Sequence, residues 1–137
     1  MAPMPLAAAD YSAFDWMITP IRRYASFRGR SPRAELWWYM LFCIMLGGVF
    51  GGVDIGIYGL RWLSSDTITR PSGLWLSLLL VIPSLAVTVR RLHDIGKSGW
   101  WYLIGLIPVI GGLVLLIWFL RRGDVGPNAY GPDPYRD

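Results

Sequence analysis

The sequence has little of what soluble and secreted domains rely on. Charged residues make up 16% of its 137 residues, against about 25% in ordinary soluble domains, whereas hydrophobic residues make up 54%. Intrinsic disorder needs the opposite composition and is excluded as the main state. Cys43 is the only cysteine, so a disulfide scaffold within the chain is excluded too. The composition that remains is that of a membrane protein of one domain.

Three stretches without charge hold most of the apolar residues, at 36–53, 71–89 and 98–120. As helices they would be about 27–35 Å long, which matches a hydrocarbon core of roughly 30 Å. None has the polar stripe of a soluble helix, and in hydrocarbon a segment must satisfy its own backbone hydrogen bonds. Tryptophan and tyrosine at the ends of the stretches are typical of membrane interfaces. We therefore expect three transmembrane helices, at about 34–56, 71–92 and 98–120.

The flanking segments complete the predicted fold class. Residues 1–13 lack the basic region and apolar core of a secretory signal peptide and predict a disordered lead. Residues 14–30 predict an interfacial amphipathic helix weakened by Pro20. Its apolar face has helical spacing and comprises Phe14, Met17, Ile18, Ile21 and Tyr24. Residues 121–137, rich in turn formers, predict an irregular polar tail. The prediction is an all-α, polytopic membrane helical protein with its membrane domain at 31–120.

The basic residues favour a cytoplasmic N-terminus. Five Lys or Arg precede the first span, two lie in the first loop, three in the second and three in the tail. Three spans then place eight on the cytoplasmic side and five outside. Pro108, Gly111 and Gly112 interrupt the third stretch, and a re-entrant hairpin there would return the tail to the cytoplasm. We favour a full span because Pro and Gly are common in spanning helices, and the hairpin stays open as the alternative.

Two polar motifs flank the spans. Ser31 followed by Pro32 predicts a helix start, with a serine cap and proline at the first helical position. Glu35, one turn further, is expected to pair with Arg33 or with an arginine of the next loop. The second motif, residues 89–101, links two spans through a short glycine-containing turn, where guanidinium groups and helix amides could hold a phosphate. Its glycine spacing is not that of a P-loop.

We expect the charged residues of both motifs to meet at one membrane–water interface. The set is Arg28, Arg30, Arg33, Glu35, Arg90, Arg91, His93, Asp94 and Lys97. The working hypothesis is a non-enzymatic module that binds an anionic lipid headgroup or a partner protein through this cluster. We expect no catalytic residue, metal or cofactor, because the single histidine has neither a second soft ligand nor a serine nucleophile arrangement. Nucleic acid is not expected, since topology and headgroups explain the cations.

Two other functions are weighed against this hypothesis. Asp54 becomes an intramembrane carboxylate if the first helix continues past Val53, and such groups are functional candidates. A small oligomeric transporter or channel subunit would use it to line a pathway, and paired glycines in the same stretch weakly favour self-association. An intramembrane enzyme using His93 and Asp94 is the weakest reading, because no nucleophile or metal set accompanies them.

Four ordered motifs resemble the small bacterial inner-membrane proteins grouped as domain of unknown function 805, the YhaH-like proteins. They are Arg28-Gly29-Arg30 with Arg33, Glu35 and Trp37-Trp38; Arg90 to Asp94 with Ser98 to Trp101; Ile107-Pro108 with Gly111; and Asn128 with Tyr130 to Pro134. The resemblance covers about residues 20–135 and implies a bacterial inner-membrane location without an established activity. Ala129 stands where relatives usually have a basic residue, and Pro32 where many have a serine that would form a capping box.

Overall fold

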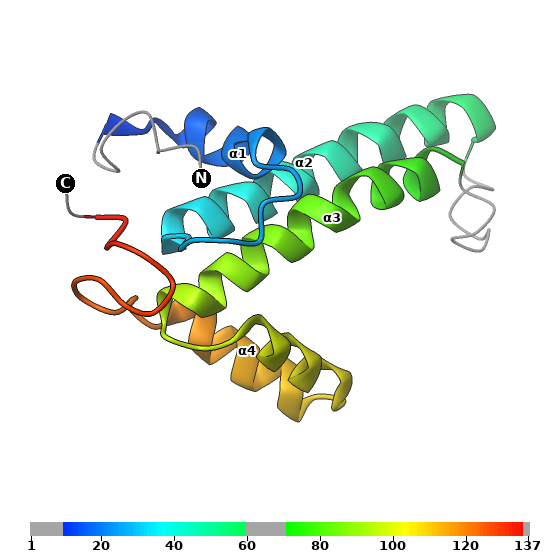
Figure 1. The fold of residues 1–137 in the computed structure, drawn as a ribbon. Helices are drawn as coiled ribbons and strands as arrows, with labels where there is room; N and C mark the ends of the chain where they lie inside the picture. Colours follow the sequence, from blue (N-terminus) through cyan, green and yellow to red (C-terminus); the bar gives the residue numbers. More distant parts are fainter. Residues whose placement is uncertain (1–9, 60–70, 136–137) are drawn as a thin grey trace.

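The computed structural model describes residues 10–59 and 71–135, without the side chains of Pro71 and Ser72, and is helical with irregular connections over these residues. The elements in chain order are α1 (Ala13–Arg22), α2 (Arg33–Tyr58), α3 (Pro71–Asp94), the 3-10 helix η4 (Gly99–Leu106) and α4 (Ile110–Leu120). In Figure 1, α2 and α3 lie side by side, α1 crosses the first half of α2, and η4 with α4 lies against the second half of α3.

Helices α2 and α3 are each long and apolar enough to cross a membrane. The predicted spans at 34–56 and 71–92 fall on these two helices, which extend by one or two residues beyond each prediction at most ends. Gly59 ends α2 with a φ of 68°, a backbone conformation that glycine adopts without strain. Asp54 is therefore inside a helix, where it is 3% exposed.

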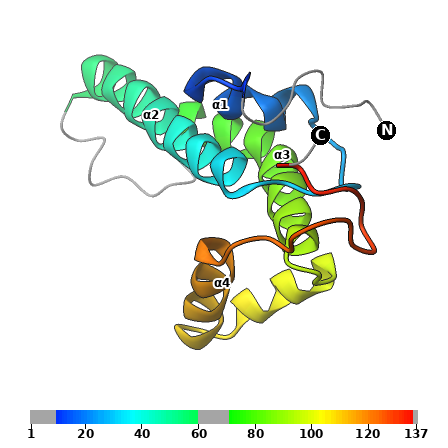
Figure 2. The same cartoon turned by 90° about the vertical axis from the view of Figure 1, so that its left-hand side faces the viewer.

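The third apolar stretch, residues 98–120, is not one helix, contrary to the continuous span predicted for it. The chain forms η4, turns at Ile107 to Val109, and returns as α4, so that the two elements lie side by side as a hairpin (Figure 2). Helix α4 has 11 residues, about 16 Å of rise, which is half the thickness of a hydrocarbon core. The described chain path is that of the hairpin alternative.

Two local features explain the hairpin. Val109 has a φ of 64°, which is rare for a β-branched residue and reverses the chain after Pro108. At Gly111 the two arms touch, because a Cβ atom there would lie 1.8 Å from the carbonyl oxygen of Ile104. Only glycine allows this approach, so the same residues that interrupt the apolar pattern also form the turn.

Helix α1 is found in the segment predicted to be interfacial, and the face that packs against α2 is not the predicted apolar face. Trp16, Thr19 and Pro20 are buried, whereas Phe14 is 64% and Ile21 38% exposed. The apolar face was expected to lie in the membrane surface, and the adjacent, buried face is the one that packs against α2. The helix begins with a capping box between Ser12 and Asp15 and continues through Pro20. Residues 1–9 of the predicted lead lie outside the described residues.

The buried core is small and the apolar surface is large. One cluster joins Leu36 and Tyr39 of α2 to Val87 of α3, and a second joins Leu92 and Ile95 to Leu115 of α4. Most large apolar side chains on the outer faces of α2, η4 and α4 are exposed. A soluble monomer rarely carries apolar surface on this scale, whereas lipid tails solvate it without cost.

Candidate functional site

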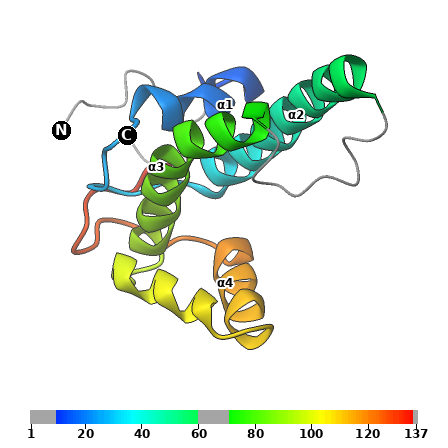
Figure 3. The ribbon, with the colours of Figure 1, turned by 90° about the vertical axis from the view of Figure 1, so that its right-hand side faces the viewer.

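The charged residues of the predicted set lie at one end of the molecule. The segment before α2, the C-terminal end of α3 and the segment after α4 meet there, as the light blue and red traces show in Figure 3. Five of these residues are buried and form what we call the buried ion-pair network: Arg30, Glu35, Arg90, Arg91 and Asp94. The network therefore links parts of the chain that are up to 96 residues apart.

Asp94 is the centre of one half of the network. Its Oδ1 accepts from Nε of Arg30 at 2.9 Å, and its Oδ2 accepts from Nη1 of Arg91. The other nitrogens of Arg30 donate to the backbone carbonyls of Asp124 and Gly126. Arg91 donates in the same way to the carbonyl of Arg121. The segment after α4 thus completes the hydrogen bonding of two buried arginines.

Glu35 is the centre of the other half. Its Oε1 accepts from Nη2 of Arg90 at 2.6 Å, and its Oε2 accepts from the Ser31 hydroxyl at 2.8 Å. Glu35 therefore pairs with Arg90, near the C-terminal end of α3, and not with Arg33. The predicted serine cap is wrong: Pro32 is the N-cap residue, and no side chain caps α2. The Ser31 hydroxyl is committed to the carboxylate instead, because burial requires each carboxylate oxygen to have a donor.

In the buried ion-pair network, the attraction between the charges is opposed by the free-energy cost of removing them from water. Removing charges from water costs several kcal/mol per ion, and close pairing with added hydrogen bonds offsets this loss. Within the described residues, Nε of Arg90 and Nε of Arg91 are the buried side-chain polar atoms without a partner. Losing one member of a pair would leave its partner charged and buried. The network therefore fixes the positions of α2, α3 and the segment before α2 relative to one another.

His93 lies beside the network and is held by the loops on both sides. Its Nδ1 donates to the carbonyl of Gly29 at 3.1 Å, because a carbonyl can only accept. Its ring stacks on the ring of Tyr130 with centroids 4.0 Å apart and an interplanar angle of 4°. The Asn128 side chain donates to the His93 carbonyl at 2.9 Å. His93 and Asp94 therefore do not form a hydrogen-bonded dyad.

The three remaining residues of the predicted set lie around the network. Arg28 and Arg33 are exposed, and Nη1 of Arg33 donates to the carbonyl of Leu120 at the end of α4. Lys97 places its ammonium group 4.5 Å from the Trp118 ring and 5.4 Å from the Trp101 ring. The described structure thus brings all nine predicted residues to one end, with five sealed inside.

The predicted set omitted several residues that complete this end of the molecule. Tyr130, Asn128 and the backbone carbonyls of Asp124 and Gly126 all contact the network or His93. Gly123 is required as well, since a Cβ atom there would lie 2.0 Å from Oδ2 of Asp94. Turn-forming composition predicts an irregular segment but not its contacts. The fourth motif of the family resemblance was the sequence signal for Asn128 and Tyr130, and it did not include Gly123, Asp124 or Gly126.

Asp54 does not belong to this site. It lies five turns along α2 from Glu35, about 28 Å of helical rise away. Within residues 10–59 and 71–135, no group of three or more His, Cys, Asp or Glu side chains is placed to hold a metal ion.

Outside the spans, partial burial and the nearby charge of Arg90 lower the pKa of the Arg23 guanidinium, whose Nη2 donates to the Arg28 carbonyl at 3.3 Å.

These features define a helical membrane protein with its charged residues collected at one end. Residues 24–132 match the family described as "Protein of unknown function (DUF805)", and the chain belongs to this family. It is 37% identical over 120 residues to "Inner membrane protein YhaH" of Escherichia coli strain K12, covering 88% of this chain and 96% of that protein.

A second relative from the same strain is "Inner membrane protein YhaI", 37% identical over 119 residues, which is 87% of this chain and 94% of that protein. "Uncharacterized protein YiiR" is 29% identical over 99 residues, covering 72% of this chain and 56% of that protein. No solved structure matches the chain. The inner-membrane relatives agree with the apolar helices, and the family carries no assigned activity.

Proposed function

We propose that this protein is a non-enzymatic inner-membrane module that binds anionic lipid headgroups at its charged end. Four exposed arginines carry the proposal, and they come from two parts of the chain: Arg28, Arg33, Arg121 and Arg122. Arg33 reaches the end of α4, and Arg91 bonds the Arg121 carbonyl, so these parts lie beside each other. Cations at a membrane surface attract anionic lipids by about 1 kcal/mol each.

The buried ion-pair network supports this proposal indirectly. Arg30, Arg90 and Arg91 are 4% exposed or less, so they are not available to a headgroup. Their charges are paired with Glu35 and Asp94. In this proposal the network positions the surrounding segments, and the exposed arginines make the contact. The proposed headgroup site therefore keeps Arg28 and Arg33 from the predicted cluster and adds Arg121 and Arg122 from the tail.

The proposed orientation places this charged end on the cytoplasmic side. The N-terminal end of α2, the turn after α3 and the C-terminal end of α4 share it. Eleven Lys and Arg then lie on one side of the membrane and two, Arg61 and Arg70, on the other. This asymmetry is stronger than three spans would give, and it fits the preference of Lys and Arg for cytoplasmic segments.

An enzyme or a transporter receives less support. The two carboxylate oxygens of Asp94 accept hydrogen bonds from arginines, and Nδ1 of His93 donates to a backbone carbonyl. His93 and Asp94 are therefore not arranged as an acid–base pair. Asp54 is 3% exposed within one chain, so it offers little surface to a pathway formed between copies. We therefore do not propose the transporter or channel alternative.

The test measures which lipids the protein retains. The purified protein is placed in bilayer nanodiscs of phosphatidylcholine and phosphatidylglycerol at four to one, and bound lipids are counted by native mass spectrometry. The double variant Arg121→Gln with Arg122→Gln should lower the retained ratio of anionic to neutral lipid by roughly 30-fold at low salt, from about 2 kcal/mol. Arg22→Gln, which removes an exposed cation on α1, is the matched control and should leave the ratio unchanged.

Two results would contradict the proposal. An unchanged lipid ratio in the double variant, with the helical content preserved, would remove the headgroup function. Loss of a copurifying membrane protein in that same variant, without a change in lipid, would assign the exposed arginines to a protein partner instead.

A further inference from the structure

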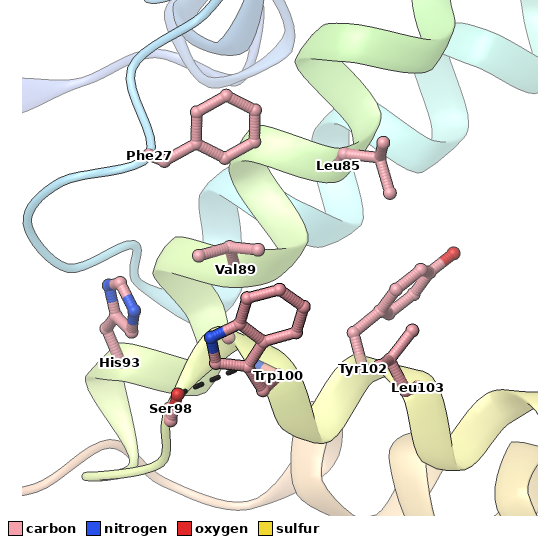
Figure 4. A pocket seen from close by; sticks show the side chains of 9 residues that line it. Phe27, Leu85, Val89, His93, Ser98, Trp100, Tyr102 and Leu103 are labelled. Atoms are coloured by element: carbon pink, nitrogen blue, oxygen red, sulfur yellow. Dashed lines mark hydrogen bonds between the residues drawn. The ribbon is translucent and has the colours of Figure 1, made fainter.

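A cavity of about 440 Å³ lies between the second half of α3 and η4. Figure 4 shows its walls, which come from both helices and from the segment before α2. Most of the lining is apolar and includes Phe27, Leu85, Val89, Trp100 and Leu103. The volume falls within the range of about 300–1,000 Å³ that is usual for small-molecule sites. The cavity is therefore large enough for part of a lipid-like molecule.

No charged side chain lines this cavity within the described residues. A charged group inside it would lose its hydration without gaining a counter-ion, which is strongly unfavourable. Arg90, on the same helix, is 0% exposed and paired with Glu35. The lining thus excludes an anionic headgroup and selects an uncharged ligand.

His93 supplies a hydrogen-bond acceptor to the wall of the cavity. Because Nδ1 donates to the Gly29 carbonyl, the neutral ring carries its free lone pair on Nε2. The stacked Tyr130 ring fixes the plane of the imidazole. Nε2 has no hydrogen-bond partner among the described residues, and it is not among the sealed polar atoms. It is therefore accessible to a donor from outside the protein.

Ser98 supplies the complementary donor. Its Oγ accepts from the backbone N–H of Trp100 at 3.4 Å at the start of η4, which leaves the hydroxyl hydrogen free to donate. Ser98 lines the same cavity as His93, on the same side in Figure 4. An alcohol oxygen both donates and accepts, so one hydroxyl group matches the pair.

Exposed apolar side chains of η4 form one wall of the cavity. Trp100 is 79% and Leu103 52% exposed on η4, on a surface that lipid tails contact in a membrane protein. A ligand would enter sideways from the bilayer. We propose that this cavity binds an uncharged, membrane-soluble alcohol, with its apolar chain between α3 and η4 and its hydroxyl group donating to His93 and accepting from Ser98. This proposal uses none of the exposed arginines, so it stands or fails separately from headgroup binding.

The test is photolabelling in phosphatidylcholine nanodiscs with a diazirine analogue of 1-hexadecanol. Mass spectrometry should locate the label on residues 98–106. Unlabelled 1-hexadecanol should compete, whereas its methyl ether, which lacks the donor, should need roughly three- to tenfold higher concentration. Palmitate should compete still more weakly at neutral pH. Equal competition by the alcohol and the ether would overturn the role of His93.

Variants separate the cavity from the rest of the lipid-facing surface. Leu85→Trp fills the cavity and should reduce labelling at least tenfold, and His93→Phe, which keeps an aromatic ring against Tyr130, should reduce it three- to tenfold. Leu78→Trp is the matched control, because Leu78 lies on the same helix, is 54% exposed and does not line the cavity. If Leu85→Trp does not fold, Leu103→Trp replaces it. Wild-type labelling in a folded cavity-filling variant would overturn the proposal.

Discussion

Glu35 and Arg90 lie 55 residues apart in the sequence, yet their side chains form a 2.6 Å ion pair with no exposed surface on either one. The pair joins the first turn of α2 to the last turns of α3, so it fixes the register of the two long helices. An isolated surface pair would contribute little. A sealed pair makes each partner depend on the other, and this dependence can be measured.

Glu35→Ala should lower the free energy of unfolding by about 3–5 kcal/mol, because it leaves Arg90 charged and buried without its partner. The double variant Glu35→Leu with Arg90→Met should lose less than the sum of the two single variants, since apolar pairs can replace buried ion pairs. Thermal unfolding in detergent, followed by circular dichroism, gives the comparison. Strict additivity would mean that the two side chains do not interact energetically.

Gly111→Ala should disrupt the hairpin of η4 and α4. Its new methyl group would lie 1.8 Å from the Ile104 carbonyl oxygen, whereas nothing lies within 4 Å of the same position at Gly112. Gly112→Ala is therefore the matched control and should keep or slightly raise the melting temperature, since alanine favours helix. Equal melting temperatures for the two variants would show that the arms are not in contact at this point.

Reporters fused after Asp137 and before Ala13 should lie on the same side of the membrane, in the cytoplasm. A full span at 98–120 would place them on opposite sides, whereas the hairpin returns the chain to the side where α2 begins. The measurement is the activity of a paired set of cytoplasmic and periplasmic reporters in living cells. Opposite sides would contradict both the hairpin and the proposed orientation.

Lys97→Gln should lower stability by about 0.5–2 kcal/mol, because the ammonium group lies over the Trp118 and Trp101 rings. Lys97→Arg should retain most of this contribution, since a guanidinium group also stacks on aromatic rings. Melting temperatures at low and high salt provide the measurement. A full loss in the arginine variant would assign the effect to side-chain shape instead of charge.

Acidification should weaken the start of α1. Hydrogen bonds from Ser12 lower the pKa of Asp15 below its ordinary value of 3.8. A lowered pKa in the folded state means that the carboxylate stabilises the fold above the unfolded-state pKa and loses this effect as the pH falls through the folded-state pKa. The difference in melting temperature between the wild type and Asp15→Asn should therefore close at acid pH. A difference that persists unchanged below pH 3 would contradict the capping role.

Composition predicts the long helices because the bilayer leaves few alternatives. An uncharged stretch as long as the hydrocarbon core must satisfy its own backbone, and helix is the simplest solution. The path of residues 98–120 was not decided in this way, because Pro108 and Gly111 are compatible with both a span and a turn. Only the contact between Gly111 and Ile104 distinguishes the two.

The candidate site was predictable as a set of residues and not as a set of contacts. Charge at the ends of the helices indicated that the arginines and carboxylates would meet, but several arginines were equivalent partners for Glu35 on sequence grounds. In the structure Arg90 is buried against Glu35, whereas Arg33 is exposed. This difference in burial cannot be read from the sequence. For α1, periodicity identified an apolar face without showing which face packs against α2.

The carbonyl groups of Asp124 and Gly126 that receive Arg30 have a consequence for biogenesis. Because α2 and α3 precede this segment in the chain, Arg30 and Arg91 lack its carbonyl acceptors until the segment after α4 has left the ribosome. Before then, burying either guanidinium group would leave its N–H groups without acceptors, which is unfavourable. A chain truncated before Asp124 would therefore lack two of the acceptors of Arg30, so this end of the molecule is completed only by its last segment.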